Sequence, residues 1–336
     1  MPQVRRSCCR FRRRLTASFV AALALLLVTT SASAWNASGH LQIALVAYRM
    51  LAPETRENVV ELLRAHPRFD RDFTLKRPAD LQTPEQERKW LFAHAATWAD
   101  IARRQPAFHR ERWHFINEPI FLGKDDRSFF EAAGITNNLS HELAVRANEP
   151  ELNIVQAIAL AERKLASGRT PKGERALYAS WLMHLVGDAH QPLHAVSLYS
   201  KRRFPKGDKG GNDVLVGKRS LHAVWDGFLG TSESVRYLND KVSEYLREPK
   251  LERAADEALA SLSAADWIDE SYDLALEFAY DEKILSAVTA VEASGSKAKP
   301  STYLPPSYLS EGKEHSKRRA VQAGARLAAL LRALAG

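Results

Sequence analysis

Residues 174–190 place stronger limits on the fold than any other part of the sequence. They read ERALYASWLMHLVGDAH and are apolar on most faces of a helix, which predicts a central, buried helix. Two ionisable residues on it, His184 and Asp188, are four positions apart and share one face. Pro192 follows and is expected to end or kink the helix before His194. The fold must therefore supply partners for ionisable side chains inside its core.

Most of the remaining sequence also has helical spacing. Residues 40–52 and 153–167 place apolar residues at intervals that fit one helix face. Another helix is expected to begin at Pro53, because proline is tolerated in the first turn. Further helices are expected within residues 254–285 and 315–334.

Strand signals are scarce. Residues 211–218 (GNDVLVGK) favour a short hairpin arm between glycine-rich turns. The longest loops are expected at residues 66–83, 105–126, 198–212 and 293–311. Neither a fixed-period repeat nor a linker is visible in the sequence. We therefore predict an all-α fold, a single multi-helix domain over residues 35–336 with at most a short β-hairpin.

The first 34 residues have the parts of a secretory signal peptide. Six arginines precede an apolar run over residues 17–28, and Ala32-Ser33-Ala34 matches the cleavage pattern. We expect cleavage between Ala34 and Trp35, and a secreted or periplasmic protein without stable membrane association. An uncleaved anchor is the weaker alternative, because the apolar run is too short to span a bilayer comfortably.

Removal of residues 1–34 would change both the net charge of the chain and its number of cysteines. The whole chain carries a net charge of +8, and the six arginines account for all but +2 of it, so the basic balance does not indicate a nucleic-acid-binding surface. Both cysteines, Cys8 and Cys9, lie in the same segment. The mature chain would contain neither disulfides nor thiolate ligands, so a metal would be held by His, Asp, Glu or backbone atoms.

Polar residues that look out of place on the apolar segments are nearly all histidine or aspartate. A single such pair is explained equally well by a helix-surface hydrogen bond or a satisfied core histidine, and His94 and His190 suit a structural or supporting role. The combination is more specific, because a cluster of divalent cations is one of the few partners that could neutralise several buried carboxylates. Zinc suits this mixture of imidazole and carboxylate. The candidate ligands are His40, Asp100, His114, His184, Asp188, His194, His222 and Asp226.

These residues lie in motifs that resemble the S1/P1 nuclease family, zinc-dependent enzymes related to bacterial phospholipase C. The resemblance covers essentially the whole predicted mature chain and implies the all-α phospholipase C/P1 nuclease fold. The matching segments are Trp35 with GH at 39–40, TWAD at 97–100, WHFIN at 113–117, HLVGDAHQPLH at 184–194, GDKGGN at 207–212, LHAVWD at 221–226 and AGARLAALL at 323–331.

The resemblance implies a site for three zinc ions. One ion would take Asp100, His114, His184 and Asp188 as ligands. A second would share Asp100 and Asp188 and add His40 with the free amine and the carbonyl oxygen of Trp35. The third would be held by His194, His222 and Asp226, with water completing its shell. Cleavage after Ala34 would then create a ligand, because an amide nitrogen has no available lone pair and a free amine has one.

The function implied by the resemblance is a zinc-dependent endonuclease that hydrolyses single-stranded RNA and DNA to 5′-phosphorylated products, with 3′-nucleotidase activity as a further expectation. Catalysis would use water activated by zinc, with Asp100 and Arg103 as the catalytic residues. Arg103 matches a family residue that contacts phosphate, and Phe115 matches one that stacks on a base. A solvated helix arginine and a core phenylalanine are the competing interpretations of these two residues.

Two other functions stay open at this point. A zinc-dependent phospholipase C is disfavoured mildly by Asp226, where those enzymes look to use glutamate, and by the Gly-Gly-Asn segment before LHAVWD. A non-catalytic secreted zinc-binding helical protein would require a closed, structural ligand set, whereas the third ion retains a position for water. The expected partners are nucleic acids and nucleotides as substrates, and no protein partner is implied.

Overall fold

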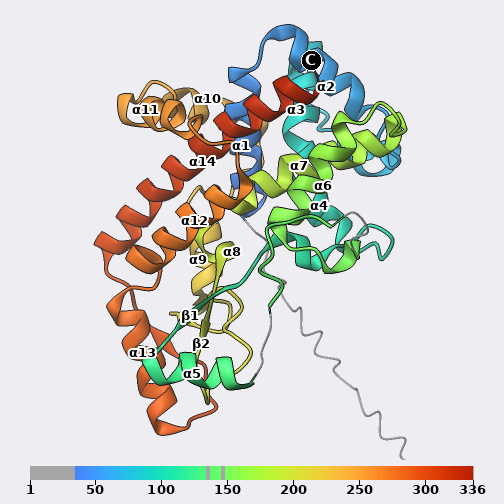
Figure 1. The fold of residues 1–336 in the computed structure, drawn as a ribbon. Helices are drawn as coiled ribbons and strands as arrows, with labels where there is room; N and C mark the ends of the chain where they lie inside the picture. The colour runs from blue at the N-terminus through green and yellow to red at the C-terminus, as the bar shows by residue number, and fades with distance from the viewer. Residues whose placement is uncertain (1–34, 134–136, 145–147, 336) are drawn as a thin grey trace, which may run out of the picture. The chain divides into compact units, whose positions relative to one another are not determined.

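A computed structural model describes residues 35–133, 137–144 and 148–335 (Figure 1). The predicted signal peptide, residues 1–34, lies outside the described residues. The predicted all-α class is confirmed. The helices are α1 (Ala37–Met50), α2 (Pro53–Leu63), α3 (Pro84–Ala95), α4 (Trp98–Ala102), α5 (Lys124–Ala133), α6 (Ile154–Ala166), α7 (Lys172–Ala189), α8 (Pro192–Ala195), α9 (Leu221–Asp226), α10 (Val235–Tyr245), α11 (Pro249–Ala258), α12 (Ala264–Leu274), α13 (Glu282–Ser294) and α14 (Pro306–Ala335).

Short helical turns and small sheets join these helices. The 3₁₀ turns are η2 (Thr74–Lys76), η3 (Glu111–His114) and η4 (Glu149–Glu151), and the π-helical turns are η1 (Phe69–Phe73) and η5 (Ala275–Ala279). The strands are β1 (Glu118–Phe121), β2 (Val196–Tyr199), β3 (Leu215–Val216), β4 (Arg219–Ser220) and β5 (Ser301–Thr302).

The expected hairpin is present as β3 and β4, which pair antiparallel, and β5 adds to β3 in parallel. A second sheet, the parallel pair β1 and β2, was not predicted. Its strands are far apart in the sequence and only four residues long, so local spacing carries little signal for it. The pair joins the chain segment after His114 to the segment after His194.

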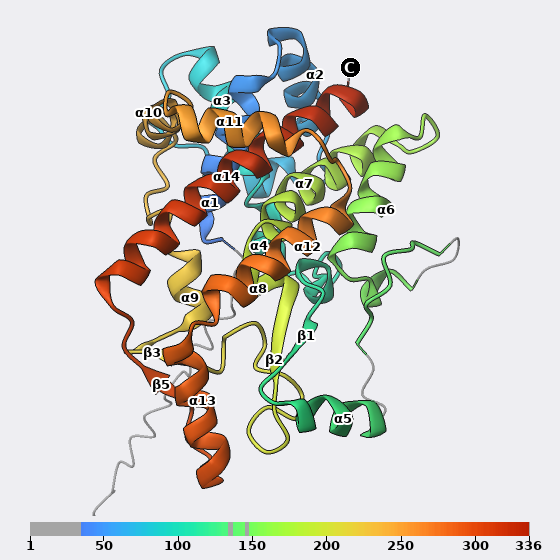
Figure 2. The same cartoon turned by 60° about the vertical axis from the view of Figure 1, so that its left-hand side comes forward.

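Helix α7 lies at the centre, as its composition predicts (Figure 2). It contacts α1, α2, α4, α6, α12 and α14. Every residue from 178 to 200 is buried, including the turn that follows the helix. Because α7 is surrounded by helices from both halves of the sequence, its side chains can meet residues that are remote along the chain.

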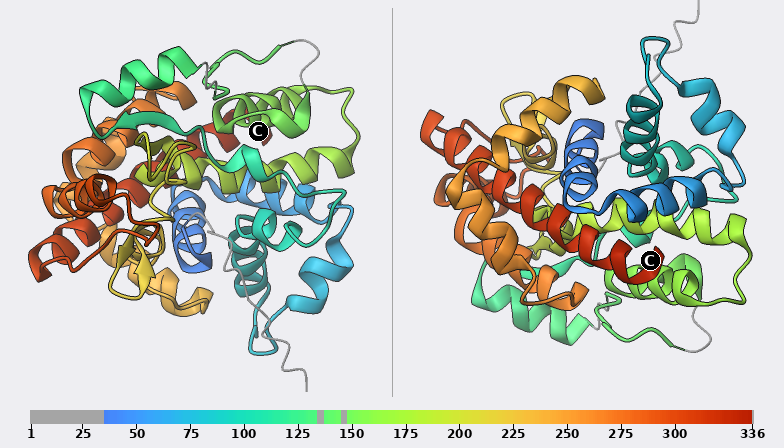
Figure 3. Two further views of the ribbon diagram at one scale, coloured as in Figure 1. Left: turned by 90° about the horizontal axis from the view of Figure 1, so that it is seen from below. Right: turned by 90° about the horizontal axis from the view of Figure 1, so that it is seen from above.

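Proline positions define several helix boundaries. Pro53 occupies the first turn of α2, as expected. Helix α7 ends at Ala189 and α8 begins at Pro192, so the proline separates His190 from His194. The last helix begins at Pro306, inside a segment expected to be loop. Pro306 is compatible with a helix start, and α14 then packs along α1 and α11 (Figure 3).

A buried charged network joins α14 to α12 and to the end of α7. Arg326 donates to both carboxylate oxygens of Glu270 at 2.6 and 2.7 Å, and Arg319 contacts the same carboxylate. Arg326 also donates to Nε2 of His190 at 2.8 Å, and Nδ1 of His190 contacts the Val186 carbonyl oxygen at 2.7 Å. His190 therefore has a structural role, because both of its ring nitrogens have protein partners.

We expect Glu270→Gln to lower the free energy of unfolding at pH 7 by about 1–3 kcal/mol, measured by urea unfolding. The substitution leaves two buried guanidinium groups without their anion, and the partial exposure of Glu270 reduces the cost. Glu257→Gln is the matched control, because its pair with Arg318 lies at the surface and should change stability by less than about 1 kcal/mol. Equal effects of the two variants on the free energy of unfolding would contradict a stabilising role for the ion pairs of Glu270.

The stability difference between wild type and Glu270→Gln depends on pH through the pKa of Glu270. Burial alone would raise that pKa, but hydrogen bonds and charge from Arg326 and Arg319 lower it to about 2. A carboxyl whose pKa is lower in the folded state stabilises the fold above its unfolded pKa and loses that effect as the pH falls. The difference between wild type and Glu270→Gln should therefore narrow as the pH falls from about 4.5 to about 2.

Candidate metal centre

The eight histidine and aspartate candidates converge on three neighbouring groups. The groups are His40, His184 and Asp188; Asp100, His114 and His184; and His194, His222 and Asp226. Within each group the potential ligand atoms lie within 4.8 Å of one another. The residues come from α1, α4, η3, α7, α8 and α9, so the convergence is a product of the tertiary fold.

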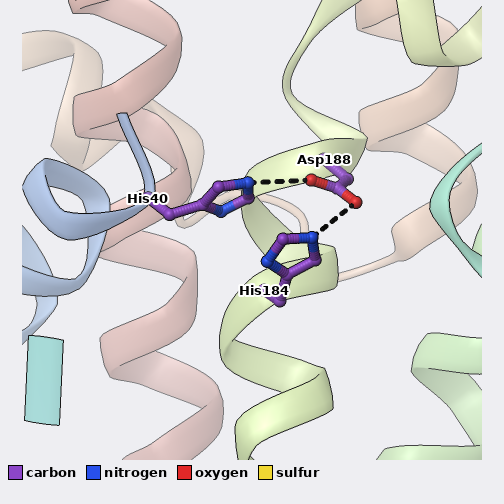
Figure 4. Close-up of side chains that lie close together, drawn as sticks. All are labelled: His40, His184 and Asp188. Atoms are coloured by element: carbon purple, nitrogen blue, oxygen red, sulfur yellow. Dashed lines mark ion pairs between the residues drawn. The ribbon is translucent and has the colours of Figure 1, made fainter. Parts of the chain in front are cut away.

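The carboxylate of Asp188 connects the first two groups. Its Oδ1 lies 3.2 Å from Nε2 of His40, and its Oδ2 lies 3.2 Å from Nε2 of His184 (Figure 4). Oδ2 also lies 2.8 Å from Nδ1 of His114. Three imidazoles from three separate elements thus surround one fully buried carboxylate.

The spacing of three of these atoms fits one face of a tetrahedral zinc shell. Nδ1 of His114 and Nε2 of His184 are 3.2 Å apart, and each lies near Oδ2 of Asp188 at the distances given above. Zinc bonds of about 2.0 Å in tetrahedral geometry place neighbouring ligand atoms about 3.3 Å apart. Oδ1 of Asp100 lies 3.9 Å from Nε2 of His184. The ligand atoms of Asp100, His114 and His184 therefore form a group that could hold a metal ion, and Asp188 joins His184 in the adjoining group.

Backbone carbonyls fix the ring orientation of three histidines. Nδ1 of His184 contacts the Ala96 oxygen at 2.7 Å, and Nδ1 of His222 contacts the Gly210 oxygen at 2.7 Å. Nδ1 of His194 contacts the carbonyl oxygen of His114. A proton on each Nδ1 leaves the lone pair on Nε2 as the available metal ligand. The Nε2 atoms of His194 and His222 are buried and have no hydrogen-bond partner, which suits ligand atoms.

Burial keeps most of these imidazoles neutral, the form that binds metal. It lowers the pKa of His114 to about 4 and that of His222 to about 3, although contacts with Asp188 and with a backbone oxygen act in the opposite direction. His184 differs, because the charges of Asp188 and Asp100 outweigh its burial and raise its pKa. The position between these two carboxylates therefore favours a positive charge.

The pKa values of the two core aspartates, Asp188 and Asp226, are shifted in opposite directions. Burial disfavours the ionised form of Asp188, but the charge of His184 and hydrogen bonds from the surrounding histidines hold its pKa well below the usual range. Burial raises the pKa of Asp226 well above its usual value, and a 2.8 Å hydrogen bond from Gln191 offsets only part of the rise. A cation beside Asp226 would restore its ionised form.

The start of the described chain lies against these groups. Trp35 is fully buried, and its indole nitrogen donates to the Gly187 oxygen at 3.1 Å. The backbone amide of Asn36 donates to the backbone carbonyl oxygen of Asp226 at 3.4 Å. The indole of Trp35 and the backbone of Asn36 thereby hold the start of the described chain against α7, directly before Asp188, and against the end of α9.

The two remaining candidates lie next to the centre. Nε of Arg103 lies 2.9 Å from Oδ1 of Asp100, and both side chains are 19% exposed. The neighbouring Arg104 is exposed, so the two arginines differ in environment. Phe115 directly follows His114 and is partly exposed, which does not match the alternative of a buried core residue.

Sequence reasoning did not identify Gln191 as a supporting residue. Its amide nitrogen donates to Asp226, and its amide oxygen accepts from the Leu193 backbone at 2.6 Å. It therefore orients one candidate ligand and caps the turn that carries His194. The carbonyl oxygens of Ala96, His114 and Gly210 have no sequence signal, because every residue carries a carbonyl.

Comparison with known proteins identifies a family and several relatives. The profile of the family described as S1/P1 nuclease matches residues 35–336. Endonuclease 5 of Arabidopsis thaliana is 30% identical over 137 residues, which cover 33% of this chain and only 44% of that protein. Endonuclease 3 of the same plant is 24% identical over 285 residues, 78% of this chain and 80% of the relative. Endonuclease 4 is 40% identical over 63 residues, 18% of each protein.

We expect Gly187→Ala to lower the free energy of unfolding by about 1–3 kcal/mol, because an added Cβ would lie 2.8 Å from Nδ1 of His40. An ordinary helical glycine would instead gain about 0.5–1 kcal/mol from this change. Gly168→Ala, in the turn after α6, is the control for an added Cβ without a clash, since no atom lies within 4 Å of it. Urea unfolding of both variants decides the point, and a more stable Gly187→Ala would show that α7 and His40 do not pack so closely.

Proposed function

The chain belongs to the S1/P1 nuclease family, and from that premise we propose that it is a secreted, zinc-dependent endonuclease. Its substrates would be single-stranded RNA and DNA, its products 5′-phosphorylated, and 3′-nucleotidase activity would use the same site. The observation that supports this best is the triangle of His114, His184 and Asp188 ligand atoms at 2.8–3.2 Å. Such spacing suits ligands that share a cation.

Three zinc ions would be held by the residues of the three groups, together with the amine and carbonyl oxygen of Trp35. Zinc in such a site supplies hydroxide near neutral pH and neutralises charge on a leaving oxygen. Hydrolysis forms a bond from water oxygen to phosphorus and breaks the bond to the 3′-oxygen, so the phosphate stays on the 5′ side. No side-chain nucleophile is required.

The protein's own groups would position the substrate. Asp100 holds the guanidinium of Arg103 beside the second group, where it could pair with a phosphate oxygen. Phe115 lies one residue after His114 and is partly exposed, so its ring could stack on an unpaired base. Stacking of this kind favours single strands, whose bases are free to meet an aromatic face.

Export is part of the proposal. The family match begins at residue 35, directly after the Ala32-Ser33-Ala34 pattern. Among the described residues, no helix has the length and apolar character needed to cross a membrane. Cleavage before Trp35 would release the backbone amine that the second zinc ion requires.

The proposed activity is tested with the mature chain on single-stranded DNA and on phosphatidylcholine, together with its metal content. We expect cleavage of DNA only, three zinc ions per chain, and loss of activity after chelation that zinc restores. Asp100→Asn should abolish activity with an unchanged circular dichroism spectrum, whereas Asp70→Asn, an exposed control, should retain it. Hydrolysis of the lipid alone would indicate a phospholipase C, and bound zinc without either activity a non-catalytic zinc protein.

The role of the chain terminus is tested by adding one residue before Trp35. The extension converts the amine into an amide without a lone pair, so one zinc ion should be lost and two retained, as measured by elemental analysis. A one-residue extension at the opposite end is the control and should retain all three. Three zinc ions in the N-terminally extended protein would exclude the amine as a ligand.

A further inference from the structure

Asp208 is a fully buried carboxylate that the proposed reaction does not use. It lies in the glycine-rich segment 207–212, between β2 and the β3–β4 hairpin. Among the described residues no lysine or arginine forms an ion pair with it. A buried carboxylate without a cationic partner is costly unless hydrogen bonds compensate, so its presence requires a local reason.

Four donors satisfy this carboxylate. Oδ1 accepts from the Leu198 amide at 2.9 Å and from the Ser197 hydroxyl at 3.3 Å. Oδ2 accepts from the Gly211 amide at 3.0 Å and from the Tyr280 hydroxyl at 2.6 Å. Asp208 thus ties its own loop to β2 and to the buried tyrosine that follows η5.

The loop that Asp208 holds has an unusual backbone. Lys209 has a φ of 59°, and Gly207, Gly210 and Gly211 have φ values of +80°, +59° and +79°. A Cβ on Gly210 would lie 2.1 Å from the Leu193 carbonyl oxygen, so the loop packs tightly against the residue before His194. Such a run of left-handed residues needs outside contacts to persist. The carboxylate of Asp208 supplies several of them.

This conformation directs one carbonyl at a candidate ligand. The Gly210 oxygen contacts Nδ1 of His222 at 2.7 Å, which leaves Nε2 as the atom that faces the third group. The adjacent Gly211 oxygen contacts the His222 amide at 3.5 Å. The same loop therefore contacts the chain beside both histidines of the third group, His194 on α8 and His222 on α9.

We propose that Asp208 is a positioning residue for the third metal group. Hydrogen-bonded by Tyr280 and two backbone amides, it holds the loop so that the Gly210 carbonyl fixes the ring of His222 as an Nε2 ligand. Asp208 does not touch the metal or the substrate. The inference rests on the zinc centre of the proposed function, and it assigns the support of the third ion to a residue outside the ligand set.

The test measures zinc retention of the mature protein against a graded chelator. Asp208→Asn should retain two ions as tightly as wild type and hold the third about 10- to 100-fold more weakly, the range known for residues that orient metal ligands. Tyr280→Phe removes a single donor and should weaken the third ion about fivefold, which decides the question if Asp208→Asn does not fold.

Asp213→Asn is the matched control. Asp213 belongs to the same loop, but its partners are Lys209 and Lys299 at 3.0 and 2.8 Å, on the partly exposed side. Its loss should leave all three ions bound as in wild type. Weakening of the third ion in this variant to the same degree as in Asp208→Asn would overturn the assignment to Asp208.

A double-mutant cycle with His222→Ala separates positioning from general destabilisation. If Asp208 acts through His222, adding Asp208→Asn to His222→Ala should cause no further zinc loss. An additive loss, or wild-type retention in Asp208→Asn, would overturn the proposal while leaving the zinc-dependent function intact. A wild-type protein that binds no zinc would instead defeat the proposed function itself.

Discussion

The buried carboxylate of Asp188 is the constraint from which the rest of the centre follows. Helix α7 carries it into the middle of the core, where an unpartnered negative charge would destabilise the fold. Imidazoles from α1, η3 and α7 itself surround it, each with a ring nitrogen within 3.2 Å of a carboxylate oxygen of Asp188. Burial lowers the pKa of His40 and His114, so of these three imidazoles only His184, whose pKa is raised, favours a positive charge beside Asp188. The ligand atoms around Asp188 could therefore hold a cation, and their spacing suits zinc.

The surrounding helices hold this arrangement through backbone atoms as much as through side chains. Carbonyls of Ala96, His114 and Gly210 fix three imidazole rings, and the Gly187 carbonyl receives the indole of Trp35. These oxygens come from loops and helix ends, and the Gly187 oxygen also accepts from the His190 amide at the end of α7. The centre is consequently built where helices begin and end around α7. The parallel strands β1 and β2 add to it by joining the segments that follow His114 and His194.

Support for the centre extends outward from the candidate ligands through residues that are not ligands themselves. Gln191 orients Asp226 directly, and Asp208 is placed to act on His222 through one peptide carbonyl. Farther out, the Arg326 and Glu270 network ties α14 and α12 to His190 at the end of α7. Each of these supports uses a buried polar group whose partners are satisfied by protein atoms. This explains how a core with so many ionisable side chains can remain well packed.

The sequence by itself determined the helical class, the central position of α7, the break at Pro192, and which histidines and aspartates lie in apolar surroundings. These features depend on local spacing, which the chain carries in full. The tertiary structure alone decided that His184 lies between two groups, that Gln191 and the Gly210 carbonyl orient ligands, and that β1 pairs with β2. Those relations join residues 12 or more positions apart, and they exist only after the helices have packed around α7. The spacing of apolar residues predicts which face of a segment is buried, but it does not predict which residues that face will contact.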